Sequence, residues 1–149
     1  ALLAAGYVPV VASLAGDNEG QVYNINADTL AEQLAVALRA QKLIFLTSAP
    51  GVLRDRADPA TLVAFADPDD LASLLQSGAI AGGMRPKVEA CIRAATGGVE
   101  RTHIIDGRAA DALLFEVFTG AGCGTMIVGR KQKATYLGVD LADAASNRR

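Results

Sequence analysis

Apolar runs of strand length alternate with amphipathic stretches along this chain. The pattern predicts extended segments at 7–13, 21–25, 42–47, 102–106 and 124–128. The last three are apolar without polar alternation, which is typical of strands buried on both faces. Amphipathic or capped stretches predict helices at 28–40, 68–77, 86–96 and 109–118. This alternation of strands with helices predicts an α/β layer fold with a mainly parallel sheet.

No internal repeat or linker interrupts the pattern, so residues 1–129 are expected to form one unit. The polar, alanine-rich residues 130–149 are expected to be a mobile tail. The first six residues resemble the last turn of a helix that stops at Gly6, and the chain begins without Met. We therefore expect it to be part of a longer protein.

Composition excludes several classes of function. Half of the 149 residues are hydrophobic (51%), but no apolar run reaches the ~18 residues of a membrane span. A net charge of −2, few aromatic residues and no Trp argue against a nucleic-acid surface. The two cysteines, Cys91 and Cys123, have no spaced His partner for zinc, and we expect reduced thiols in a cytoplasmic protein.

The stretch from Gly82 to Lys87 carries the clearest chemical signal. Pro86 suits the first position of a helix, and the preceding glycines allow close backbone approach. Arg85 and Lys87 then add two cations to the positive end of the helix dipole, where cations are normally disfavoured. An anion, most commonly phosphate, would explain this arrangement.

Other polar positions are open to two interpretations. Asn24, Asn26 and Asp28 precede a helix and could orient a polar substrate, but Asn and Asp are also ordinary turn and cap residues. The loop after residue 47 lies where open α/β sheets bind ligands, or it is a plain connection. His103 lies in an apolar strand, where a core or interface histidine is common. The chain contains neither a Walker P-loop nor a dinucleotide-binding glycine motif.

Five motifs in register resemble a known family. They are Tyr23-Asn24-Ile25-Asn26-Ala27-Asp28-Thr29, Lys42-Leu43-Ile44-Phe45-Leu46-Thr47, Gly82-Gly83-Met84-Arg85-Pro86-Lys87-Val88-Glu89-Ala90, His103-Ile104-Ile105-Asp106-Gly107-Arg108 and Phe118-Thr119-Gly120-Ala121-Gly122-Cys123-Gly124-Thr125-Met126-Ile127. Together they are similar to the C-terminal, nucleotide-binding half of the N-acetylglutamate kinases, within the amino acid kinase superfamily. The resemblance covers residues 6–128 and implies a three-layer sandwich around a mainly parallel sheet.

The resemblance implies phosphorylation of the γ-carboxylate of N-acetyl-L-glutamate by ATP, with Mg²⁺ held through the nucleotide, in arginine biosynthesis. Lys87 matches the lysine that stabilises the transferring phosphoryl group, and Asp28 the aspartate that organises the catalytic lysines. Asn24 matches a substrate ligand, and Asn26 lines the same site. The nucleotide-binding positions implied are Thr47, Ser48, Ala49, Pro50, Gly51, Val52, Leu53, Ala79, Ile80, Ala81 and Met84.

His103, Glu116 and Gly122 match the arginine site of feedback-inhibited members, which are hexamers. The resemblance thus implies arginine as an inhibitor and a homo-oligomer, dimeric or hexameric, in the intact enzyme. Taken singly, Glu116 could be a solvated helix residue and Gly122 a turn glycine.

The chain departs from the family pattern in several places. Many relatives have Asp at the position of Ser48, Arg85 replaces a commonly apolar residue, and the tail is longer than the family needs. The glycine-rich phosphate loop and a second catalytic lysine belong to an N-terminal half that is not in this sequence. The isolated chain is therefore expected to be inactive.

Two rival functions remain at this point. Acetylglutamate synthases carry a similar kinase-like domain fused to an acetyltransferase domain that uses acetyl-CoA. The chain could also be a non-catalytic, arginine-binding regulatory module.

Overall fold

A computed structural model of the chain describes residues 2–119, 122–129, 133 and 136, and the predicted tail at 130–149 lies outside them apart from Lys133 and Tyr136. Its centre is a four-stranded sheet in the order β3-β5-β6-β4. The strands are β3 (Lys42–Thr47), β4 (Phe65–Ala66), β5 (Arg101–Asp106) and β6 (Gly124–Val128). β3 pairs with β5 and β4 with β6 in parallel, whereas β5 and β6 are antiparallel. The sheet is mixed and mainly parallel, as predicted.

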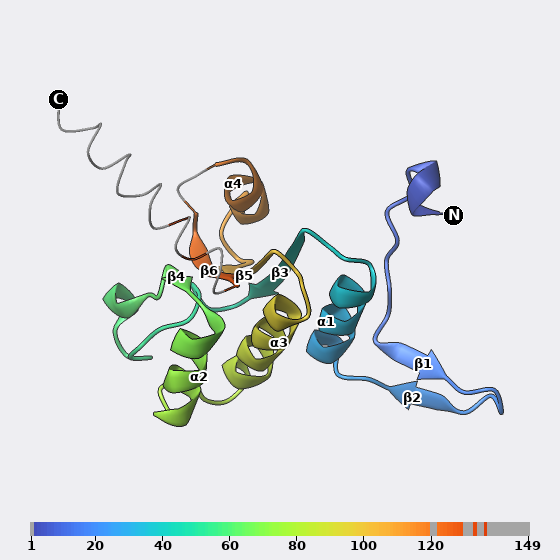
Figure 1. The fold of residues 1–149 in the computed structure, drawn as a ribbon, viewed down its shortest axis with the longest axis horizontal. Coiled ribbons are helices and arrows are strands. Elements are labelled where there is room, and N and C mark those ends of the chain that lie inside the picture. Colours follow the sequence, from blue (N-terminus) through green and yellow to red (C-terminus); the bar gives the residue numbers. More distant parts are fainter. Residues whose placement is uncertain (1, 120–121, 130–132, 134–135, 137–149) are drawn as a thin grey trace.

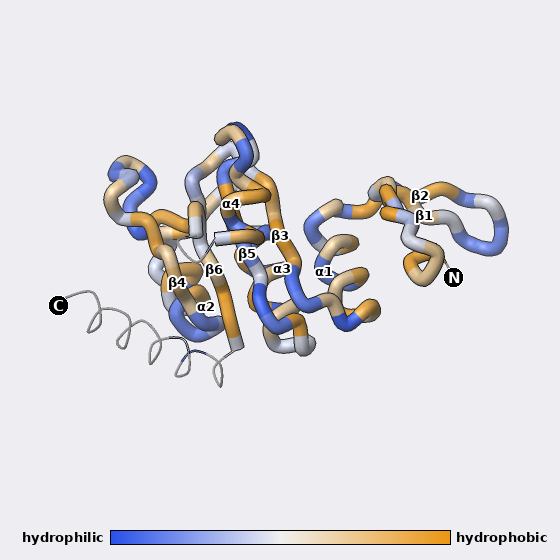
Figure 2. Tube along the Cα trace, turned by 90° about the horizontal axis from the view of Figure 1, so that it is seen from above, coloured by the Kyte–Doolittle hydropathy of each residue, from blue (hydrophilic) through white to orange (hydrophobic). Residues whose placement is uncertain are grey.

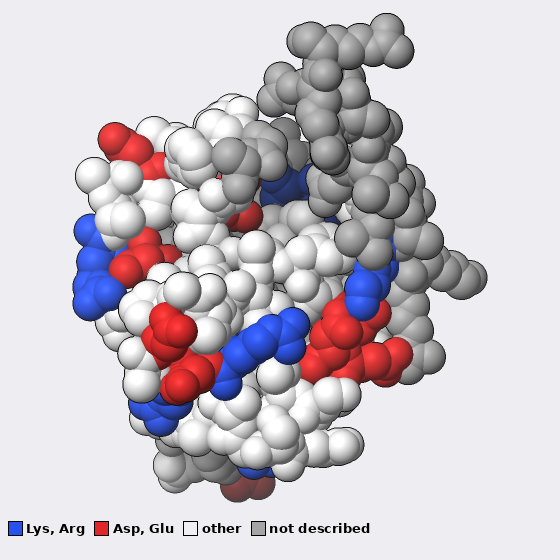
Figure 3. All heavy atoms as spheres, turned by 90° about the vertical axis from the view of Figure 1, so that its left-hand side faces the viewer, with Lys and Arg blue, Asp and Glu red and all other residues white. Residues whose placement is uncertain are grey.

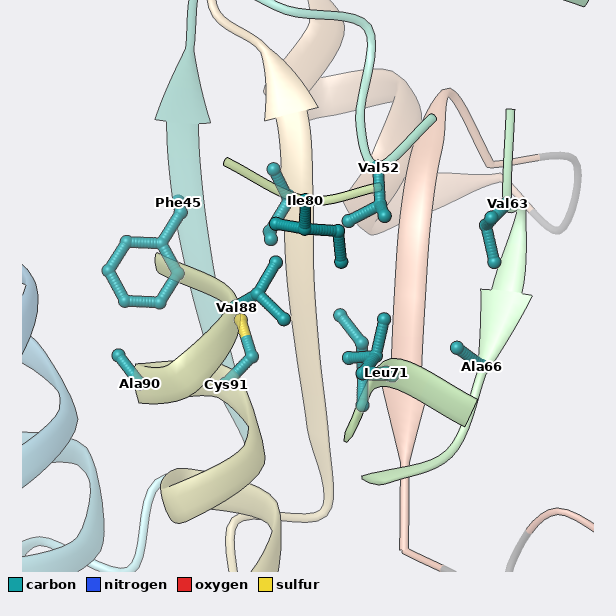
Figure 4. Close-up of a cluster of buried hydrophobic side chains, with 11 residues drawn as sticks. Phe45, Val52, Val63, Ala66, Leu71, Ile80, Val88, Ala90 and Cys91 are labelled. Carbon is teal, nitrogen blue, oxygen red and sulfur yellow. The ribbon is translucent and has the colours of Figure 1, made fainter. Parts of the chain in front are cut away.

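Helices cover both faces of this sheet (Figure 1). On one face lie α1 (Ala27–Ala37), α2 (Pro68–Gln76) and α3 (Met84–Thr96), and α4 (Ala112–Phe118) lies on the other. The core lies between the three-helix layer and the sheet, where α3 is central (Figure 4). Val88 and Cys91 of α3 are fully buried against Phe45 and Ile104 of the strands. The predicted α/β layer fold is confirmed.

The N-terminal residues lie apart from this body. After a short 3-10 helix (Leu3–Ala5), the chain runs to an antiparallel hairpin of β1 (Leu14–Gly16) and β2 (Val22–Asn24), which projects from the sheet (Figures 1 and 2). The strand predicted at 7–13 is wrong. Val8 and Val10 are 87% and 97% exposed, and among the described residues this segment pairs with no strand. An apolar run favours extended backbone, but a strand also requires a hydrogen-bonding neighbour.

Three helices, α1, α3 and α4, begin at a different residue from the one predicted. α1 begins one residue early, because the side chain of Asn26 caps it by accepting from the amides of Asp28 and Thr29. α3 begins at Met84, so Pro86 is its third residue and not its first. Pro86 is still tolerated there, because the first four helical N–H groups have no intrahelical acceptor.

The remaining boundaries follow local chemistry. α2 ends near its predicted limit and begins with a full capping box between Asp67 and Asp70. α1 ends at Ala37, before the predicted residue 40, and Arg39 then takes a left-handed backbone with a φ of 51°. α4 begins three residues later than predicted, after a turn that ends at Asp111, whose φ is 56°.

Candidate functional site

A cleft of about 620 Å³ opens at the carboxyl end of β3. One wall is the loop that follows β3, and the other is the segment leading into α3. The residues lining it are Thr47, Ser48, Ala49, Pro50, Gly51, Leu53, Arg56, Pro59, Ala79, Ile80, Ala81, Gly83, Met84 and Lys87. The nucleotide positions predicted at 47–51, 53, 79–81 and 84 therefore form one concave surface of the size typical of small-molecule sites.

Val52 is the one nucleotide-site residue of the sequence prediction that does not line the cleft. It is fully buried, and its N–H donates to Thr125 Oγ1 at 2.8 Å. The neighbouring Gly51 has a φ of 150°, and a Cβ there would lie 2.7 Å from the same Oγ1. Val52 and Gly51 thus anchor the loop to β6, which leaves the adjoining residues to form the wall.

Arg56, Pro59 and Gly83 line the cleft although the sequence did not mark them as site residues. The sequence indicated a solvated segment at 54–59. In the structure, Leu53 and Leu62 form an antiparallel bridge, which folds this segment back beside the cleft. Gly83 belongs to the Gly82–Lys87 motif, so the glycines that permit close approach were a usable signal.

Lys87 lies at the cleft and is held by Asp28. Its Nζ is 3.0 Å from both Asp28 Oδ1 and Oδ2, and the two side chains are 26% and 16% exposed. Asp28 lies in the first turn of α1 and Lys87 in that of α3, so the packing of the two helices joins residues 59 positions apart. The pair fixes an ammonium group at the edge of the cleft, which suits contact with an anion.

Arg85, the other cation of the motif, does not line the cleft. Its Nε donates to Glu89 Oε1 at 2.8 Å across one turn of α3, and the pair is exposed. An i,i+4 ion pair is sufficient to explain Arg85 without a ligand.

The two candidate substrate amides are placed near Asp28 in the chain but do not line the cleft. Asn26 Oδ1 is occupied by the two backbone amides of α1 that it caps. Asn24 is exposed at the end of β2, opposite Leu14 in the hairpin. Only the amide nitrogen of Asn26 and the side chain of Asn24 therefore remain available to a ligand.

The three residues matched to an arginine site meet on the other face of the sheet. His103 Nδ1 lies 2.6 Å from Glu116 Oε1, and the Cys123 N–H donates to Glu116 Oε2 at 2.7 Å. A Cβ on Gly122 would lie 3.8 Å from Oε2, so this glycine borders the carboxylate. Glu116 is 8% exposed, which contradicts its interpretation as a solvated helix residue.

Burial and hydrogen bonding shift the pKa values in this cluster. Burial lowers the pKa of His103, and the opposing pull of Glu116 only partly offsets it. Nε2 of His103 is buried and has no partner among the described residues, so a proton there would lack an acceptor. Burial opposes ionisation of Glu116, but hydrogen bonds from the Cys123 backbone and from His103 outweigh it and lower its pKa. A neutral histidine beside a charged carboxylate is the arrangement this geometry favours.

Charged side chains of both signs are exposed outside the cleft, as in the Arg85–Glu89 pair. On the face drawn in Figure 3, acidic and basic side chains lie next to each other between uncharged areas. Within the described ranges, no helix is long and apolar enough to cross a membrane. The same residues contain no group of three or more His, Cys, Asp or Glu side chains that could hold a metal ion.

Comparison with known proteins gives consistent similarities. The sequence model of the Amino acid kinase family matches residues 1–106. An acetylglutamate kinase from Synechococcus sp. (strain RCC307) is 52% identical over 132 residues, which are 89% of this chain and 45% of that protein. The chain thus spans less than half the length of this curated relative.

Two solved structures share the fold. The N-acetylglutamate synthase of Neisseria gonorrhoeae, complexed with coenzyme A and L-arginine, has a TM-score of 0.78 and 31% identity. The match covers 85% of this chain and 28% of that one. Carbamate kinase from Giardia lamblia bound to AMP-PNP has a TM-score of 0.60 and 25% identity, over 78% of this chain and 37% of that one.

Proposed function

The chain belongs to the amino acid kinase family, and we propose that it is the ATP-binding, C-terminal part of an acetylglutamate kinase. The intact protein would transfer the γ-phosphoryl group of ATP to the γ-carboxylate of N-acetyl-L-glutamate, a step of arginine biosynthesis. The observation that carries this proposal is the Lys87–Asp28 pair at the edge of the cleft.

Lys87 suits phosphoryl transfer because that reaction depends mainly on positioning and charge stabilisation. Its ammonium group is fixed by both oxygens of Asp28 and can still donate to an oxygen of the transferring group. Asp28 is thereby a positioning residue, and its own orientation is set by the first turn of α1. An equivalent cation from the other half of the protein would complete the charge clamp.

The cleft suits the nucleotide. Leu53, Ile80 and Met84 supply apolar walls for a planar base, and the loop at 47–51 supplies backbone polar groups. Mg²⁺ would arrive on the nucleotide phosphates and supply Lewis-acid charge neutralisation there. Asn24 and the amide nitrogen of Asn26 are proposed to contact the acceptor, since both lie close in sequence to Asp28.

We also propose that arginine binds at His103, Glu116 and Gly122 and inhibits the intact oligomer. A buried, ionised carboxylate is suited to pairing with a guanidinium or an α-ammonium group. The structural neighbour from Neisseria gonorrhoeae was solved with L-arginine, which favours this ligand.

A second candidate function is the kinase-like domain of an acetylglutamate synthase. It is favoured by the TM-score of 0.78 to that neisserial enzyme. Higher identity to acetylglutamate kinases argues for the first candidate. A non-catalytic arginine-binding module is the third.

One experiment separates the three. The full-length protein is assayed with ATP plus N-acetyl-L-glutamate and, separately, with acetyl-CoA plus L-glutamate. We expect ADP and acetylglutamyl phosphate in the first assay and no acetyl transfer in the second. Acetyl transfer alone would identify a synthase. Neither reaction, with arginine still raising the melting temperature, would identify the regulatory module.

A further inference from the structure

The nucleotide cleft contains two cationic side chains with different electrostatic surroundings. Lys87 and Arg56 are the charged residues that line it, and none of the described lining residues is acidic. Both oxygens of Asp28 already accept from Lys87 at 3.0 Å, so this pair presents little net charge to an approaching anion. The attraction of the cleft for a free polyphosphate must then come mainly from Arg56.

Arg56 has no direct carboxylate partner among the described residues, although carboxylates flank it in the sequence. Asp55 Oδ1 accepts from the amide of Ala57, and Asp58 Oδ1 accepts from the amide of Ala60, each at 2.9 Å. Within the part of the chain that the structure describes, the Arg56 guanidinium forms no ion pair. Turn formation therefore directs one oxygen of each acid to the backbone, and the guanidinium stays available to a ligand.

The loop that carries Arg56 is held in place by Thr61. Thr61 Oγ1 accepts from the amide of Asp55 at 3.0 Å and contacts the carbonyls of Asp55 and Asp58 at 3.0 and 2.6 Å. The carbonyl of Thr61 accepts from the Arg54 amide at 3.1 Å, next to the Leu53–Leu62 bridge. A backbone ordered in advance lowers the entropic cost of binding through Arg56.

We propose that Arg56 binds a phosphate group of the nucleotide in the ground state, whereas Lys87 acts on the phosphoryl group in transfer. The proposal rests on the function proposed above and assigns its two cations separate roles. Arg56 sets nucleotide affinity, because its charge is free before the ligand arrives and its planar fork suits phosphate. Lys87 sets the rate, because Asp28 offsets its charge until further negative charge develops beside it.

Calorimetric titration of the full-length protein with ATP and with adenosine tests this assignment. Arg56→Gln should weaken ATP binding about tenfold, since a charge-assisted hydrogen bond is lost, and leave adenosine binding unchanged. Raising the salt to 0.5 M should reduce that loss of affinity, because salt screens the attraction between Arg56 and phosphate: the Debye length falls by roughly two-thirds between 0.1 M and 1 M. Arg56→Lys should fall in between. Arg54→Gln is the matched control, with the same charge change in the same loop outside the cleft, and should alter ATP binding less than about twofold.

Several results would overturn the proposal. These are an unchanged ATP affinity in Arg56→Gln, an equal loss for ATP and adenosine, an equal loss in Arg54→Gln, or no ATP binding by the unmodified protein. The titration needs no acceptor, so the two hypotheses can fail separately. If ATP binding depends on Arg56 but the protein does not phosphorylate acetylglutamate, only the proposed function is refuted. If the protein phosphorylates acetylglutamate but its ATP binding does not depend on Arg56, only this inference is refuted.

Discussion

Replacing Arg93 by alanine should destabilise the protein far more than the same change at Arg85 of the same helix. Arg93 Nε donates to Glu32 Oε2 at 2.8 Å and joins α3 to α1. The Glu32 side chain is only 3% exposed, whereas Arg93 is 48% exposed. Removing Arg93 leaves a buried carboxylate with only the Gln33 amide at 2.8 Å as its remaining side-chain donor among the described residues.

The burial of Glu32 sets the magnitude. Removing one partner of a fully buried ion pair costs about 3–5 kcal/mol. Water can enter where the half-exposed Arg93 lay, so we expect a loss of about 2 kcal/mol in the free energy of unfolding. The Arg85–Glu89 pair is exposed at 59% and 38%, and an exposed i,i+4 pair contributes about 0.3–0.5 kcal/mol.

Urea denaturation of the two full-length variants measures this difference in the free energy of unfolding. The comparison holds when both variants show the same dependence of that free energy on urea concentration. Glu32→Gln should cost less than Arg93→Ala, because it removes the buried charge together with its need for a partner. The reasoning is refuted if Arg93→Ala and Arg85→Ala lose similar stability, or if Glu32→Gln is the more damaging change.

Three further predictions follow from burial and packing. Burial depresses the pKa of His103 below its ordinary 6.5, so stability should begin to fall as the pH drops below about 6.5, where the histidine takes up a proton more readily in the unfolded chain. Stability should fall again below about 4.5, because the pKa of Glu116 is lowered by folding and the unfolded chain binds that proton first. His103→Asn should remove the first step in a pH series of melting temperatures. Gly124→Ala should cost about 2–3 kcal/mol in urea denaturation, because its Cβ would overlap the Ile104 carbonyl oxygen, whereas Gly83→Ala, with open space around it, should stay within ~0.5 kcal/mol. Burial raises the pKa of Cys91 to about 12, so mass-spectrometric mapping should find it alkylated only after unfolding, and labelling in the native state would contradict its placement.

The sequence predicted the layers of the fold because its signals were local. Continuous apolar runs identified β3 and β6, and the capping residues after Ala66 identified α2. The segment at 7–13 carried the same apolar signal but became no strand, because strand formation depends on a neighbour that no single segment encodes.

The candidate site was predictable where a motif coincided with an element boundary. Lys87 and the loop at 47–51 meet at the cleft, because the loop follows the carboxyl end of β3 and Lys87 lies in the first turn of α3. Arg56 was missed because its place at the cleft depends on the Leu53–Leu62 bridge and on the Thr61 contacts that hold its loop. The Glu32–Arg93 pair was likewise not predicted, since it depends on how α1 packs against α3 across 61 positions.

The rate of the Lys87→Ala variant tests the central claim most directly. The measurement is kcat and the KM for ATP in the full-length protein, with N-acetyl-L-glutamate as acceptor and Arg85→Ala as the matched control in the same helical turn. The account predicts that Lys87→Ala lowers kcat by orders of magnitude, roughly 10²–10³-fold, with much less effect on KM, and that Arg85→Ala leaves both nearly unchanged. A near-normal kcat in Lys87→Ala would contradict the assignment of Lys87 to phosphoryl transfer.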